Sequence, residues 1–218
     1  FIAFGIALWA QFKVKGNFNR WSQVRSSCGL TGAEVARRIL DAEGLYHVDV
    51  ELSQAGTLSD HYDPIARKVR LSEEVYYGNS IAALSVAAHE TGHAIQHKVS
   101  YPMLVLRHRI FPVANLGSSI APFLLIAGFL FKASGLIGLG ILFFSGAVAF
   151  HLVTLPVEFD ASARAGRKLV EMGFLRQEEM SGVKSVLGAA AMTYVASALV
   201  ALLELVKYIM IFANAREE

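Results

Sequence analysis

The sequence predicts an α+β, polytopic helical membrane protein with about four transmembrane helices and a small cytoplasmic α+β unit. Of its 218 residues, 54% are hydrophobic, which exceeds the share in a typical soluble domain. The excess is concentrated in a few long runs, as in membrane proteins, and the polar stretches between them carry short helix and strand patterns. The formal net charge of +2 gives no basis for nucleic-acid binding. The single cysteine, Cys28, excludes an intrachain disulfide and a CxxC metal site.

Four apolar runs are expected to lie in the membrane. Residues 1–12 are almost wholly apolar but shorter than the roughly 20 residues of a full span, so we interpret them as the end of a first transmembrane helix. Residues 111–157 contain two runs of spanning length with a short turn at Lys132 between them, which predicts a helical hairpin. Residues 186–213 predict the last transmembrane helix.

The charges of the polar stretches predict the orientation in the membrane. Residues 13–110 carry 12 Lys and Arg and residues 158–185 carry 5, whereas the hairpin turn carries only Lys132. The positive-inside rule therefore places both polar stretches in the cytoplasm. Four alternating crossings also put both on one side. We expect a multi-pass protein of the cytoplasmic membrane whose polar regions face the cytoplasm.

Local signals in residues 13–110 predict a mixture of helices and strands. Thr31 and Glu34 form a capping box that opens a helix, and Gly44 ends it. Apolar and polar residues alternate at 48–52 and again at 69–72, which predicts two strands.

A HExxH motif, formed by His89, Glu90 and His93, lies in a predicted helix that runs from a cap at residues 79–80 to about Lys98. Histidines at i and i+4 share a helix face, so both imidazoles can bind one metal ion. The intervening Glu can act as a general base for an attacking water. The alternative is a pair of helix histidines that only make hydrogen bonds.

A catalytic zinc ion usually has three protein ligands and one open position. His97 lies about 12 Å from His89 along the helix axis, so we expect it to support a ligand or pack the helix. Glu158 is the expected third ligand, because Pro156 suits the first turn of a helix that returns to the cytoplasm there. The alternative is that Glu158 and Asp160 only complement a helix N-terminus.

The order of these motifs resembles the YugP-like neutral zinc metallopeptidases of bacterial membranes, and more distantly the gluzincin membrane proteases of the HtpX type. The matching blocks are spread over nearly the whole chain: residues 58–64, 69–72, 87–97, 153–162 and 189–196. The resemblance implies a zincin-like cytoplasmic unit, a bacterial cytoplasmic membrane location and peptidase activity. It also implies Zn²⁺ held by His89, His93 and Glu158, with Glu90 as the base.

One position departs from the wider gluzincin pattern, which often has an Asp four residues after the ligand Glu to support a histidine ligand. Here that position is Ser162, and the Asp comes two residues earlier, at Asp160. On a regular helix Asp160 points away from Glu158, so Asp160 is only a candidate for this supporting role.

Residues upstream of the HExxH helix are candidates for contacts with the substrate. His61, Tyr62 and Arg70 could each help to stabilise an oxyanion, and Arg70 is also a candidate substrate-binding residue. The strand at 69–72 is expected to pair with an extended substrate by β-addition. The alternatives are a polar turn residue for His61 and a salt-bridged or solvated side chain for Arg70.

These observations predict a membrane-bound, zinc-dependent endopeptidase that acts on membrane-associated or unfolded proteins at the cytoplasmic membrane surface. Its expected partners are a protein or peptide substrate and the lipid bilayer, and no oligomeric state follows from the sequence.

One alternative is an intramembrane protease of the site-2 type, but only a short apolar run, 81–88, precedes the motif. Another is a non-catalytic zinc-binding adaptor or transporter. A structural zinc site is usually closed by four ligands, mostly Cys. Glu204 and Lys207 in the last apolar run can pair locally with each other, so their charges do not indicate a transporter.

Overall fold

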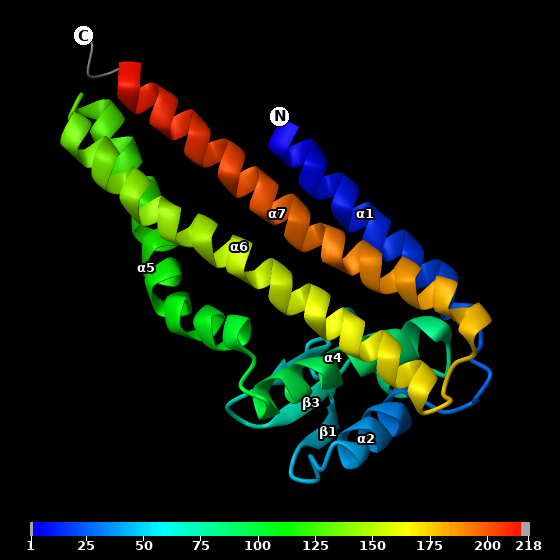
Figure 1. The fold of residues 1–218 in the computed structure, drawn as a ribbon. Coiled ribbons are helices and arrows are strands. Elements are labelled where there is room, and N and C mark those ends of the chain that lie inside the picture. The colour runs from blue at the N-terminus through cyan, green and yellow to red at the C-terminus, as the bar shows by residue number, and fades with distance from the viewer. Residues whose placement is uncertain (1, 215–218) are drawn as a thin grey trace. The chain divides into compact units, whose positions relative to one another are not determined.

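The computed structural model describes residues 2–214, which are mostly helical with one small sheet (Figure 1). The helices are α1 (Ile2–Ser22), α2 (Gly32–Ala42), α3 (Glu73–Tyr76), α4 (Ile81–Lys98), α5 (Pro102–Leu130), α6 (Ser134–Glu171) and α7 (Met180–Asn214), with a 3₁₀ turn at Gln177–Glu179. The strands are β1 (Asp49–Leu52), β2 (His61–Asp63) and β3 (Lys68–Leu71). Two compact units divide the described residues. We call residues 10–101 and 157–192 the sheet unit, and residues 2–9, 102–156 and 193–214 the helical unit.

The sheet has the strand order β1-β3-β2, with β1 parallel and β2 antiparallel to β3. Strands β1 and β3 are the two that the alternating pattern predicts, whereas β2 was not predicted. Because β3 is hydrogen-bonded on both sides, it has no free edge for another strand. The expectation that residues 69–72 pair with an extended substrate is therefore wrong, and the free edges of this sheet belong to β1 and β2.

Helix α2 begins and ends where the sequence predicts. The Thr31 hydroxyl accepts a hydrogen bond from the Glu34 backbone N–H, at 3.2 Å, and the Glu34 carboxylate accepts one from the Thr31 backbone N–H, at 2.8 Å. Gly44 follows the helix with a φ of +69°, a conformation that costs glycine little. The apolar face of α2, with Val35 and Ile39, is fully buried.

Helix α4 is buried around most of its circumference, as expected for a helix without an amphipathic pattern. Ser80 caps it by accepting a hydrogen bond from the Ala83 N–H at 3.1 Å, which confirms the predicted start. The helix packs against α2, α3, β2 and β3. Leu84 of α4 and Leu169 of α6 belong to the same core, and each such buried side chain contributes roughly 1.5–3 kcal/mol. This packing gives the HExxH motif a rigid support.

Three helices in the described part of the chain are long and apolar enough to cross a membrane: α5, α6 and the segment from Gln177 to Asn214 that includes α7. Large apolar side chains such as Phe123, Leu130 and Met210 are exposed on them, as lipid-facing residues would be. Helix α1 is not among the three. Its second half carries Lys13, Lys15 and Arg20. The structure thus supports three membrane-spanning helices directly, where the sequence predicts about four.

The turn at Lys132, with a φ of +53°, joins α5 to α6 in a helical hairpin. Helix α6 then continues without interruption from Ser134 through Pro156 to Glu171. The expectation that Pro156 opens a new helix is therefore wrong. Pro156 lies in a helix interior, where it offers no N–H to the carbonyl of Leu152.

Candidate metal centre

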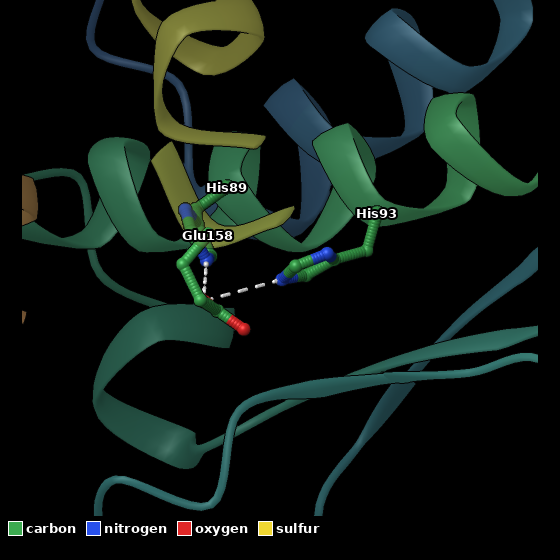
Figure 2. Close-up of side chains that lie close together, drawn as sticks. All are labelled: His89, His93 and Glu158. Carbon is green, nitrogen blue, oxygen red and sulfur yellow. Dashed lines mark hydrogen bonds and ion pairs between the residues drawn. The ribbon is translucent and has the colours of Figure 1, made fainter. Parts of the chain in front are cut away.

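The HExxH histidines occupy neighbouring turns of α4 and face the same way (Figure 2). The ring centroids of His89 and His93 are 4.8 Å apart, and the rings are nearly perpendicular, at 89°. Glu158, on α6, points its carboxylate at both imidazoles. These three side chains come from two helices that are far apart in the sequence, and all three residues belong to the sheet unit.

The distances among these side chains fit a zinc ion. Glu158 Oε2 lies 3.3 Å from His89 Nε2 and 3.7 Å from His93 Nε2. Ligands on ~2.1 Å bonds to a tetrahedral zinc are separated by about 3.4 Å. Within residues 2–214, these three form the group of potential ligands whose atoms lie within 4.8 Å of one another. Two imidazoles and one carboxylate leave a fourth position open, as catalytic zinc sites do.

A glycine allows α6 to approach the HExxH turn. A Cβ atom added at Gly92 would lie 2.7 Å from the carbonyl oxygen and 3.2 Å from the Cα of Ala161. Real side chains do not tolerate the first of these distances. The absence of a side chain at Gly92 therefore lets the backbone of α6 contact α4, and this contact brings Glu158 to the histidines.

Ser162 contacts the first histidine from the side opposite to Glu158. Its hydroxyl lies 3.1 Å from His89 Nδ1, while His89 Nε2 faces the carboxylate. This is the position where the wider gluzincin pattern has an Asp, and a serine fills it here. The contact between Ser162 and His89 was not predicted, because the expected supporting residue at this position was an Asp.

Gln96 makes the corresponding contact with the second histidine. Its Oε1 lies 3.0 Å from His93 Nδ1. Its Nε2 donates two hydrogen bonds of 2.8 Å, one to the carbonyl of Val157 and one to the carboxylate of Asp160. Asp160 in turn accepts a hydrogen bond of 2.6 Å from Arg164. Gln96 was not among the predicted site residues, although its spacing of three residues from His93 on a helix was a usable signal.

The electrostatic environment of His93 favours a positive charge. Burial alone disfavours the charged imidazolium, but the Glu158 carboxylate and the charge of Glu90 outweigh it and hold the pKa of His93 above its ordinary value. A divalent cation at this position would satisfy the same negative charges.

Glu90 lies on α4 with only 8% of its surface exposed. Its charge acts on Asp60, a residue before β2 whose carboxylate accepts hydrogen bonds from the Ser72 backbone and hydroxyl at 2.7–3.1 Å. Burial raises the pKa of Asp60, and the negative charge of Glu90 raises it further. Glu90 is thus largely shielded from solvent, on the same helix as the two histidines.

The group of potential ligands does not include His97 or His61. His97 Nδ1 is 2.8 Å from the Tyr62 hydroxyl, so this pair joins α4 to β2. His61 is exposed on β2, with its Nδ1 2.8 Å from the carbonyl of Ser59.

Arg70 is engaged in ion pairs on the sheet. Its guanidinium lies 2.9 Å from the carboxylate of Asp63 on β2 and 3.7 Å from that of Glu51 on β1. Arg70 on β3 therefore forms ion pairs with residues of both neighbouring strands, as in the alternative of a salt-bridged side chain.

Comparison with known proteins agrees with this geometry. A family model described as "Putative neutral zinc metallopeptidase" matches residues 1–213. The chain belongs to this family. It is also 60% identical over 216 residues to the "Putative membrane protease YugP" of Bacillus subtilis (strain 168), a match that covers 99% of this chain and 96% of that protein. No solved structure matches the chain. The predicted resemblance to YugP-like zinc metallopeptidases is thereby confirmed.

Proposed function

We propose that the protein is a zinc-dependent endopeptidase that hydrolyses peptide bonds of membrane-associated or unfolded proteins at the cytoplasmic surface of a bacterial membrane. The observation that carries this proposal is the convergence of Glu158 on His89 and His93, at 3.3 and 3.7 Å. A buried carboxylate with two imidazoles is a zinc-binding set of the catalytic type, and membership in a family of zinc metallopeptidases supports the same reading.

In this proposal each residue of the site has one task. His89, His93 and Glu158 would hold the zinc ion through their imidazole nitrogens and carboxylate oxygens. A bound zinc ion supplies Lewis acidity, which makes a water nucleophilic at neutral pH and polarises a carbonyl. Glu90 takes the proton from the attacking water and delivers it to the leaving amine.

The substrate would lie along an edge of the sheet rather than beside β3. Strand β2 is an edge strand and packs against α4, so it is the edge nearer to the HExxH helix. An extended substrate could pair with β2 by main-chain hydrogen bonds. His61, exposed on this strand, is the remaining candidate for a donor to the oxyanion.

Both polar stretches contribute to the sheet unit, which supports a location on one side of the membrane for both. Residues 10–101 and 157–192 form one compact unit, which supports placing the two polar stretches on the same side of the membrane. The 12 and 5 positive charges of the polar stretches favour the cytoplasmic side. With α5, α6 and α7 as three crossings, α1 would provide the fourth.

Degradation of an unfolded reporter polypeptide tests the proposed activity. We expect the purified protein in detergent, with added zinc, to cleave the reporter, and we expect Glu90→Gln to retain zinc while losing at least about 10³-fold in rate. Equal cleavage by both proteins would show that Glu90 is not the base.

The same assay separates the alternatives. Cleavage of a single-span substrate within its hydrophobic segment would favour a site-2-type protease. Zinc binding without cleavage of any unfolded or membrane-associated protein would favour a non-catalytic zinc-binding adaptor.

A further inference from the structure

Gln96 is fully buried, and its amide makes three hydrogen bonds, one to His93 on the same helix and two that join α4 to α6. It lies on α4, one turn after His93, and it reaches the turn of α6 that carries Glu158. A buried amide whose donors and acceptor are all satisfied is expensive to disturb.

The partners of Gln96 determine which way its amide points. The carbonyl of Val157 and the carboxylate of Asp160 can only accept hydrogen bonds, so the Nε2 group must face them. The Oε1 atom must then face His93, and an amide oxygen can only accept. His93 therefore carries its proton on Nδ1, which leaves the lone pair of Nε2 for a metal ion.

His89 has no equivalent constraint. Its Nδ1 meets the hydroxyl of Ser162, which can either donate or accept a hydrogen bond. The two histidine ligands thus differ, because only the tautomer of His93 is determined by its neighbour.

We propose that Gln96 is a positioning residue that fixes the tautomer and the ring orientation of His93 and ties His93 to the Glu158 turn of α6. Asp160 acts on His93 through this amide, because its carboxylate holds Nε2 in place and is itself held by Arg164. The inference rests on the proposed zinc site and assigns a supporting residue to one of its members, His93.

Zinc affinity, measured by competition with a chromophoric chelator, tests this role without relying on cleavage. Gln96→Met keeps the length of the side chain but removes all three hydrogen bonds. We expect it to weaken zinc binding by about 10–100-fold. Ser85→Ala is the matched control, because Ser85 is also buried on α4 and bonds only the carbonyl of Ile81. We expect this control to bind zinc as the wild type does.

Cobalt substitution provides a readout that a loss of stability alone would not change. The absorption bands of bound Co²⁺ report its ligand geometry. We expect altered bands in Gln96→Met and wild-type bands in Ser85→Ala, even if both variants unfold at lower temperature.

Asp160→Ala keeps the proposal testable if Gln96→Met does not fold. It removes one of the two acceptors that orient the amide, so we expect a smaller loss of zinc affinity in the same direction. Wild-type affinity and cobalt bands in Gln96→Met, or in Asp160→Ala if only that variant folds, would overturn the role of Gln96. Failure of the wild type to bind zinc would instead overturn the zinc site itself and this inference with it.

Discussion

At the scale of single residues, the metal centre depends on a place where a side chain is absent. Gly92 lies between the two histidine ligands, and its Cα faces the backbone of Ala161 on α6. Glu158, the proposed third ligand, is only three residues from this contact. The separation between α4 and α6 at Gly92 therefore decides whether three ligands can meet one ion.

Gly92→Ala should damage metal binding more than its small size suggests. The new methyl group would lie 2.7 Å from the Ala161 carbonyl oxygen, so the helices must separate. We expect a loss of about 1–3 kcal/mol in stability and at least a tenfold weaker zinc affinity, measured by chelator competition. Gly188→Ala is the control, because a Cβ atom there meets nothing within 4 Å. Wild-type zinc affinity in Gly92→Ala would show that the close approach is not needed.

The sequence reveals the ligands more readily than the residues that hold them. The spacing of His89 and His93 follows from helix geometry, and Glu158 follows from the need for a third ligand near the membrane surface. The contact of Gln96 with His93 lies within α4, but the bonds from Gln96 to Val157 and Asp160 and from Ser162 to His89 depend on how α4 and α6 pack, and no local pattern encodes that packing. The tautomer of His93 in particular follows only from partners 61 and 64 residues away from Gln96.

At the scale of helices and strands, Glu43 joins the end of α2 to two other helices of the sheet unit. Its carboxylate lies 2.7 Å from the ammonium of Lys168 on α6 and 3.4 Å from that of Lys98 at the end of α4. The hydrogen bond from Lys168 is the main reason that the pKa of Glu43 lies below its ordinary value, although burial opposes the shift. The charge of Glu43 therefore stabilises the packing of these helices.

Glu43→Gln should lower stability by about 1 kcal/mol at neutral pH, a modest value because the lysines are partly exposed. A lowered carboxyl pKa contributes stability above the unfolded pKa of about 4.5, and that contribution is lost as the pH falls through the folded pKa. Denaturant unfolding at several pH values should show the difference from wild type shrinking below pH ~4.5. Glu171→Gln is the control, because Glu171 also pairs with Lys168 but is more exposed than Glu43. We expect it to lower stability less than Glu43→Gln does. A difference that persists unchanged at acidic pH would contradict the account.

Among the elements, those with a strong local signal were predictable and those defined by tertiary pairing were not. The capping box of α2, the Ser80 cap of α4 and the alternation in β1 and β3 were each visible in the sequence. Strand β2 has only three residues and exists because it pairs with β3. Pro156 misled the prediction of a helix start, because a long apolar helix tolerates an interior proline when its neighbours satisfy the backbone.

At the scale of the whole molecule, the sheet unit is assembled from two chain segments separated by the α5–α6 hairpin. A hairpin of two membrane crossings returns the chain to the side from which it left. If α5 and α6 both cross the membrane, as their length and apolar composition allow, Glu158 after the hairpin lies on the same side as the histidines before it. The polar stretches and the zinc site are thus expected on one side of the membrane.

Cysteine labelling in intact cells tests this topology. Cys28 is the only cysteine in the chain, so Cys28→Ser gives a background without thiols. In it we expect Gln54→Cys and Ser181→Cys to react with a membrane-impermeant maleimide only after permeabilisation, and Lys132→Cys to react in intact cells. If Gln54→Cys and Ser181→Cys were labelled from opposite sides of the membrane, a single sheet unit would be contradicted. If both reacted in intact cells and Lys132→Cys reacted only after permeabilisation, the orientation would be contradicted.

The central claim is that His89, His93 and Glu158 together hold a zinc ion, and the zinc content of purified variants tests it most directly. We predict a single zinc ion per chain in the wild type and in His97→Ala, whose imidazole contacts Tyr62 instead of the site. We predict that Glu158→Ala loses zinc on dialysis under the same conditions. Full zinc retention by Glu158→Ala, or its loss from His97→Ala alone, would contradict the assigned metal centre.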